Sequence, residues 1–141
     1  MPEPLRHVAA IRKRLINDPA LLSLLQNDNR RVYVRSIRGV TDPKYPLITI
    51  WQRTGNQAVW SVKLFDPTHI IIQIYSQKDE DEAYRIQEQT RLLLHTQDLN
   101  VSTTECCFHE IREDWSNSAI WDPDTAAWVV AMRYLVRASV L

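Results

Sequence analysis

Glycine is scarce in this chain, and its scarcity excludes one large class of functions. The 141 residues contain only two glycines, Gly39 and Gly55, which lie far apart. Loops that cradle phosphate groups need several closely spaced glycines, because only glycine lets the backbone approach a phosphate so closely. The sequence therefore excludes the nucleotide enzymes that use such loops.

Cysteine is equally rare, and the only two, Cys106 and Cys107, are adjacent. Such a pair cannot build a disulfide framework and is typical of a reducing compartment. With His109 and Glu110 it forms the best candidate metal cluster, but neighbours on a strand point to opposite faces, so at most Cys107 and His109 converge. We therefore expect no metal and no cofactor, and interpret these side chains as a buried thiol and a surface histidine.

Net charge and long apolar runs are also missing. Lysine plus arginine and aspartate plus glutamate each number 17, so the formal net charge is +0. This balance argues against a protein that binds nucleic acid through a basic surface. No apolar run approaches the length of a membrane span, and charged residues interrupt the amino terminus before a secretory signal can form. We expect a soluble protein of the cytosol with no membrane partner.

Recognisable catalytic patterns are absent as well. His7, His69 and His95 lie in no nucleophile motif. The acidic pair Asp122 and Asp124 flanks a proline and is typical of a turn. We therefore predict no catalytic residue and no enzymatic activity.

Aromatic residues, by contrast, are plentiful, with five tryptophans and five tyrosines. Together with a net charge of zero, which leaves nothing to keep copies apart, they indicate a protein that associates with other proteins. An ordinary core explains the same aromatics. The length suits a single domain over residues 1–141, which buries about two-thirds of the surface of its unfolded chain.

A strand over residues 68–76 is the clearest element of the chain. Ile70, Ile72 and Ile74 fall on one side at the two-residue period of a strand, so this strand has one fully apolar face. Similar patterns predict further strands over residues 31–34, 46–53, 101–114 and 127–136. Residues 115–125, between the last two strands, are predicted to form a turn.

A helix should begin near Glu80, directly after that strand. The acidic run suits the positive end of a helix, and Asp79 with Glu82 has the spacing of a capping box. Its core-facing side is predicted to consist of Ala83, Ile86, Thr90, Leu93 and Leu94. Two earlier helices are expected over residues 4–16 and 19–26, the first with a core-facing side formed by Leu5, Val8, Ala9, Arg12, Leu15 and Ile16.

These elements define an α/β (α+β) fold: a mixed, mostly antiparallel sheet of four to five strands, packed by two or three helices. Residues 54–66 give a weaker pattern. They carry Trp60 and Phe65 among polar residues, which is typical of an extended hairpin or loop arm that contacts a partner. A strand lying on the core explains this segment equally well.

The order and spacing of several short segments are more informative than any one of them. These segments are Leu15–Leu21, Arg31–Tyr33, Tyr45–Ile50, the strand Ile72–Ser76 with its acidic-capped helix to Leu94, and Arg133–Val136. Together they extend over nearly the whole chain. In this order the chain resembles the tail terminator (tail completion) proteins of long-tailed bacteriophages and phage-like gene transfer particles.

The resemblance implies a structural protein of the virion that assembles as a ring, typically a hexamer. Such a ring caps the finished tail tube, ends its polymerisation and offers its other face to the head-side connector or stopper protein, while DNA passes through. The protein would then lie at the head–tail junction of the virion and be assembled in the host cytoplasm. The lack of net charge suits a conduit that must not hold DNA tightly.

Two other functions fit the same residues. A head-completion or stopper protein of the neck is the alternative within the same machine. A small enzyme or an adaptor module of unknown chemistry is the alternative from a different class.

A closed ring needs two different patches on each subunit, each buried by a neighbour. The candidates for this ring interface are Trp60 and Phe65 in the arm, and Trp115, Ile120 and Trp121 in the predicted turn. The candidates for a channel lining are the acidic residues Asp79, Glu80, Asp81 and Glu82, although their role as a helix cap explains them too.

Overall fold

Residues 3–52, 68–97 and 106–140 are described by the computed structural model. In chain order the elements are α1 (Glu3–Ile16), α2 (Pro19–Leu24), the 3-10 helix η1 (Asn29–Arg31), β1 (Val32–Tyr33), the 3-10 helix η2 (Ile37–Gly39), β2 (Leu47–Gln52), β3 (Thr68–Ser76), α3 (Glu80–Leu94), β4 (Cys106–Ser116), β5 (Ile120–Asp122) and β6 (Ala127–Val140). The predicted α+β class, with a mostly antiparallel sheet and three α-helices, is confirmed. None of the described helices is both long and apolar enough to cross a membrane.

The strands form one sheet in the order β1-β2-β3-β6-β4, and β5 also pairs with β6. Only the pairing of β1 with β2 is parallel. The sheet has six strands, one more than the upper end of the predicted range. The extra strand is β5, which lies in the segment predicted as a turn and continues the direction of β4 along the edge of β6.

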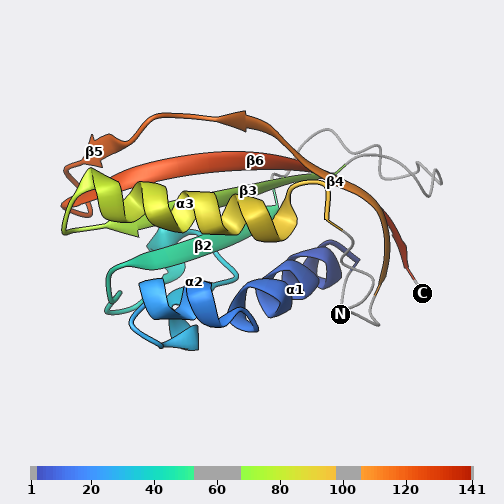
Figure 1. Cartoon of the computed structure of the whole chain (residues 1–141), viewed down its shortest axis with the longest axis horizontal. Coiled ribbons are helices and arrows are strands. Elements are labelled where there is room, and N and C mark those ends of the chain that lie inside the picture. Colours follow the sequence, from blue (N-terminus) through green and yellow to red (C-terminus); the bar gives the residue numbers. More distant parts are fainter. Residues whose placement is uncertain (1–2, 53–67, 98–105, 141) are drawn as a thin grey trace.

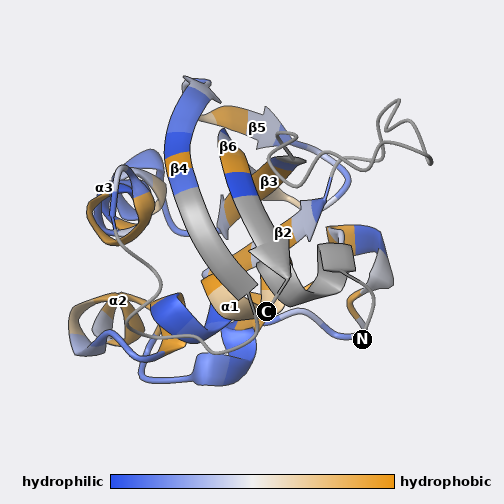
Figure 2. Ribbon diagram, turned by 90° about the vertical axis from the view of Figure 1, so that its right-hand side faces the viewer, coloured by the Kyte–Doolittle hydropathy of each residue, from blue (hydrophilic) through white to orange (hydrophobic). Residues whose placement is uncertain are grey.

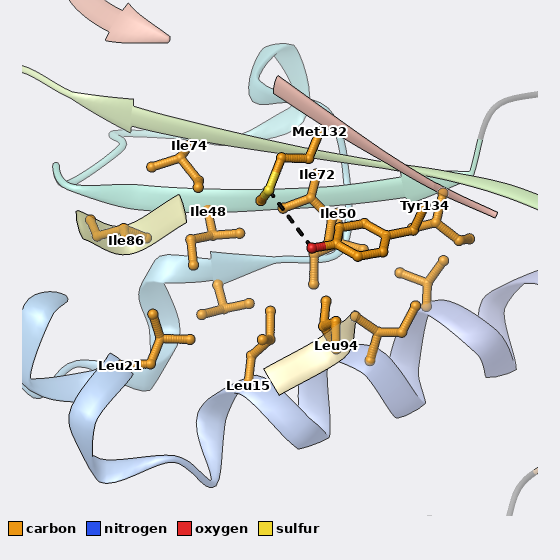
Figure 3. Packing of buried hydrophobic residues seen from close by; sticks show 14 of the residues in the cluster. Leu15, Leu21, Ile48, Ile50, Ile72, Ile74, Ile86, Leu94, Met132 and Tyr134 are labelled. Carbon is orange, nitrogen blue, oxygen red and sulfur yellow. Dashed lines mark hydrogen bonds between the residues drawn. The ribbon is translucent and has the colours of Figure 1, made fainter. Parts of the chain in front are cut away.

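The helices cover one face of the sheet, which is here called the helix face (Figures 1 and 2). Ile70, Ile72 and Ile74 of β3 point to this face, and each has 0% of its surface exposed. Register places apolar partners beside them, Ile48 and Ile50 on β2 and Val130, Met132 and Tyr134 on β6. Figure 3 shows the sheet residues Ile48, Ile50, Ile72, Ile74, Met132 and Tyr134 packed against residues of the helices, including Leu15, Leu21, Ile86 and Leu94. The predicted apolar side of the central strand is therefore the floor of the main core.

Helix α1 buries a side that only partly matches the predicted one. Val8, Ile11 and Leu15 are buried, whereas Ala9 and Arg12 are only half-buried. The Arg12 guanidinium donates from Nε to the carbonyl of Val32 at 2.8 Å and from Nη2 to the carbonyl of Asn29 at 3.1 Å. These bonds hold Arg12 at the margin of the helix face, so Ile11 takes the central place in the core.

Helix α3 begins at Glu80, as predicted, and only half of the predicted capping box forms. The carboxylate of Asp79 accepts a hydrogen bond from the N–H of Glu82 at 2.8 Å. The carboxylate of Glu82 does not return to Asp79; it accepts from the hydroxyl of Ser76 at 2.7 Å. Ser76 Oγ in turn accepts from the N–H of Lys78 at 3.2 Å. The end of β3 thus shares the task of capping α3.

Replacing Ile72 by alanine should destabilise the protein by about 2–5 kcal/mol, because it opens a cavity on the central strand. Urea unfolding measured by circular dichroism tests this. The matched control is Leu92→Ala on α3, where 61% of the side chain is exposed, so its unfolding free energy should change by no more than about 0.5 kcal/mol. Equal losses in the two variants would contradict the assignment of the core.

Candidate subunit interface

The second face of the sheet carries no α-helix in the described residues, and is here called the open face (Figure 2). At one end it is covered by the segment between β1 and β2. There a small second cluster forms from Leu47, Tyr75 and Ala127, with Tyr33, Ile37, Tyr45 and Val129 packed against it.

The predicted interface residues of segment 115–121 are exposed. Trp115 has 48% of its surface exposed, Ile120 58% and Trp121 46%. Register places Trp115 opposite Arg133 and Ile120 opposite Val129, so both lie on the open face. Trp121 lies opposite Trp128 and points to the other side, where the two rings meet edge to face with centroids 5.4 Å apart. We call Trp115, Ile120 and Trp121 the aromatic edge; it presents large side chains on both sides of one sheet margin.

Two more exposed apolar residues lie on α3 and were missed by the sequence analysis. Tyr84 has 37% of its surface exposed and Leu92 has 61%. The hydroxyl of Tyr84 accepts a hydrogen bond from the N–H of Ala119 at 2.8 Å, which ties α3 to the aromatic edge. A signal existed in the sequence, because Tyr84 and Leu92 are eight positions apart and so share a side of the helix outside the predicted core stripe.

Charged side chains occupy the open face beside Trp115. Arg133 Nε donates to the Asp114 carboxylate at 2.9 Å. Further along, Glu110 pairs with both Arg112 and Arg137, each at 2.9 Å. Such partly exposed pairs contribute little to stability. These five side chains comprise three arginines and two acidic residues, so this part of the open face carries one positive charge in excess.

A hollow of about 620 Å³ opens on the same face, next to the second cluster. It is lined by Ser36, Ile37, Arg38, Pro43, Tyr45, Gln73, Tyr75, Asp122, Asp124 and Thr125. A smaller hollow of about 300 Å³ shares Gln73, Tyr75 and Asp122 with it and reaches Ile120 and Trp121 of the aromatic edge. The two hollows therefore adjoin each other, and the smaller one extends to Ile120 of the aromatic edge.

The phenols of the larger hollow are perturbed by their surroundings. Burial raises the pKa of Tyr75 to about 12, helped by the negative charge of Asp122 and then by Tyr45. The pKa of Tyr45 is raised by the same two causes, burial first and Asp122 second. Both phenols therefore keep their protons to a higher pH than an ordinary tyrosine does, and the Tyr75 hydroxyl donates to Gln73 Oε1 at 3.3 Å.

Several backbone groups at the sheet margins are occupied, which limits pairing with a further strand. At β4, the N–H of Thr96 donates to the carbonyl of Ile111 at 2.8 Å, and the N–H of Glu113 donates to His95 Nδ1 at 2.9 Å. At the β1 margin, Arg12 occupies the carbonyl of Val32. Contacts through side chains are therefore favoured at these positions over addition of a strand.

The remaining predicted site residues fall into two groups. Trp60 and Phe65 lie outside the described residues. Of the proposed channel lining, Asp79, Glu80 and Asp81 are exposed, whereas Glu82 is half-buried by its bond to Ser76. In the described ranges no three histidine, cysteine or acidic side chains gather where they could hold a metal ion.

No protein-family profile matches the sequence, and no curated protein matches it. Among solved structures, one chain from a structure described as the virion of a native gene transfer agent (GTA) particle is similar to this chain. The two superpose with a TM-score of 0.66 at 15% sequence identity, over 93% of this chain and 92% of that chain. At this identity the similarity shows a shared fold over nearly the full length of both chains.

The raised pKa of Tyr75 predicts how stability depends on pH. Above pH 10 or so, the unfolded chain loses its phenol protons first, so the unfolding free energy should fall as the pH rises from about 10 towards 12. In Tyr75→Phe that fall should be shallower, because one contributing phenol is gone. Urea unfolding of both proteins at about pH 8 and about pH 11 measures the two slopes. Equal slopes would show that Tyr75 is not protected in the fold.

Proposed function

We propose that this protein is a structural component of a phage-like virion. The observation that carries the proposal is the shared fold with a chain of a gene transfer agent virion, which extends over 93% of this chain. The exposed aromatic edge supports it, because large apolar side chains on a surface are typical of a protein that works in an assembly.

Within the virion, the role that we propose is that of tail terminator. The chain would form a ring, typically of six copies by the resemblance described above, that caps the tail tube, ends its polymerisation and joins it to the head connector. The chain order Leu15–Leu21, Tyr45–Ile50 and Ile72–Ser76 supports this role. The fold supplies a sheet whose open face carries no α-helix in the described residues (Figure 2), and such contacts can be built there.

The ring interface is proposed to join the aromatic edge of one copy to the arm of the next. Trp115, Ile120 and Trp121 supply one patch, and Trp60 and Phe65 supply the other. The two patches differ, as a closed ring of identical subunits requires. The zero net charge of the chain adds no repulsion between neighbours.

The channel lining is proposed to include the first turn of α3. Asp79, Glu80 and Asp81 are exposed there and would repel the phosphates of passing DNA. Glu82 contributes less, because its carboxylate is held by Ser76. A lining of this kind would let DNA slide without sequence-specific contacts.

The decisive experiment is assembly with purified virion parts. The protein should co-sediment with tail tubes, and electron microscopy should show a ring at one tube end. Tubes polymerised in its presence should stop growing once capped. Binding to head connectors but not to tubes would favour the stopper role instead. A monomer that binds neither would refute a role in the neck or tail.

Replacing both Trp60 and Trp121 by alanine should give folded monomers where the unaltered protein gives rings. Size-exclusion chromatography with light scattering measures the mass, and circular dichroism checks the fold. Leu92→Ala is the matched control, since it removes an exposed apolar side chain from α3 outside the proposed patches. Rings that persist in the double variant, or rings lost in the control alone, would refute this interface.

A further inference from the structure

The larger hollow of the open face is lined by a carboxylate, that of Asp122, which forms no ion pair with a described residue. Asp122 Oδ1 accepts from the N–H of Asp124 at 3.1 Å, and Oδ2 accepts from the hydroxyl of Thr125 at 2.9 Å. Both donors are neutral. Among the residues that the structure describes, no lysine, arginine or histidine nitrogen pairs with Asp122. Arg38 lines the same hollow from η2 but is not ion-paired with Asp122.

The walls of the hollow add two aromatic rings and an amide. Tyr45 and Tyr75 both line it, and Gln73 lies on its floor. The side-chain oxygen of Gln73 is already used, because it accepts from the Tyr75 hydroxyl at 3.3 Å and from Trp51 Nε1 at 3.2 Å. Its amide NH2 has no partner among the described residues. This group is therefore available to donate to a carbonyl oxygen.

We infer that this hollow is a docking site for an arginine side chain carried by an extended segment of a partner protein. A guanidinium is planar, so it can lie against the rings of Tyr45 and Tyr75 while its N–H groups donate to the Asp122 carboxylate. Its positive charge supplies the cation that Asp122 lacks. The amide of Gln73 would hold a backbone carbonyl of the same segment.

The size and shape of the hollow favour a protein segment over a small cation. About 620 Å³ is more than one side chain fills, and the smaller hollow of about 300 Å³ extends the same surface towards Ile120. A segment lying along both would contact the floor of the sheet at Gln73 and Tyr75. This inference rests on the hollow alone and holds whether or not the protein forms a ring.

Titration of the isotope-labelled full chain with a pentapeptide tests the site by nuclear magnetic resonance. The probe is acetyl-Gly-Gly-Arg-Gly-Gly-amide, and its control carries citrulline, which has the shape of arginine without the charge. We expect saturable shifts of the amides of Gln73, Tyr75 and Thr125 with the arginine peptide. Binding of the citrulline peptide should be weaker by about tenfold or more, since hydrogen bonds to charged groups are the stronger ones. Equal affinities would overturn the inference.

Variants locate the site. Asp122→Asn keeps an acceptor oxygen for the Asp124 N–H but removes the charge, so it should weaken binding of the arginine peptide by about tenfold. Asp81→Asn, on the exposed first turn of α3, is the matched control and should leave binding unchanged. Arg38→Gln removes a competing cation and should bind at least as tightly as the unaltered protein. Loss of peptide binding in Arg38→Gln, or an unchanged affinity in Asp122→Asn, would overturn the assignment of the binding site to this hollow.

The nature of the occupant is tested with the same spectra. Spermidine, a small polyamine, should shift these amides less than the peptide does at equal concentration, because it has no backbone for Gln73 to hold. Equal or tighter binding of spermidine would overturn the assignment to a protein segment. Concentration-dependent shifts of the same amides in the protein alone would support the site and identify a second copy as the partner.

Discussion

The pairing of β3 with β6 is the contact on which the other parts of the molecule depend. It runs from Thr68–Val136 to Ser76–Trp128 without interruption. On one side it carries the apolar floor of the main core, on which α3 packs, and on the other it carries the floor of the hollow. The same strands lead directly into α3 and out of the β5–β6 turn, so the pairing also positions the helix cap and the aromatic edge. A shift of this register by one residue would exchange the two faces.

The two faces of the sheet divide the chemistry of the chain between them. The helix face holds the main core of buried apolar side chains, and its buried phenol, Tyr134, finds a sulfur acceptor in Met132 at 3.8 Å (Figure 3). Trp121 is exposed at its margin. The open face keeps tryptophan, isoleucine, tyrosine and ion pairs at its surface. Folding thus completes one face, whereas the other has the mixed aromatic and charged composition of a protein–protein contact.

Local signals in the sequence were sufficient for the elements that they control. The alternating isoleucines predicted β3 with its correct bounds, and the acidic run at Asp79 predicted the start of α3, because both patterns act within a few residues.

Contacts between residues distant in the chain determined the features that the sequence did not predict. The helical spacing of the sequence predicts that Arg12 lies in the core-facing side of α1. Its bonds to the carbonyls of Asn29 and Val32, which keep it at the margin, come from residues distant in the chain and cannot be seen in that spacing. Ile120–Asp122 resembled a turn because its strand character comes from β6. Trp115, Ile120 and Trp121 are exposed. A register shift between Glu113 and Trp115 places Trp115 on the same face as Ile120, and the alternation of strand side chains places Trp121 on the opposite face. No sequence pattern predicted the hollow, whose lining comes from three separate segments.

The occupied strand margins have a consequence for how copies of this chain can accumulate. Side chains and short connectors already satisfy the backbone at Val32, Ile111, Glu113 and Ala119. At these points a neighbour has no free ladder to extend, so the open-ended stacking that leads to fibres is blocked there. At these positions, copies of the chain must instead contact each other through side chains. The geometry of those contacts fixes the angle between neighbouring copies. An angle of that kind lets an assembly return to its starting point and become finite.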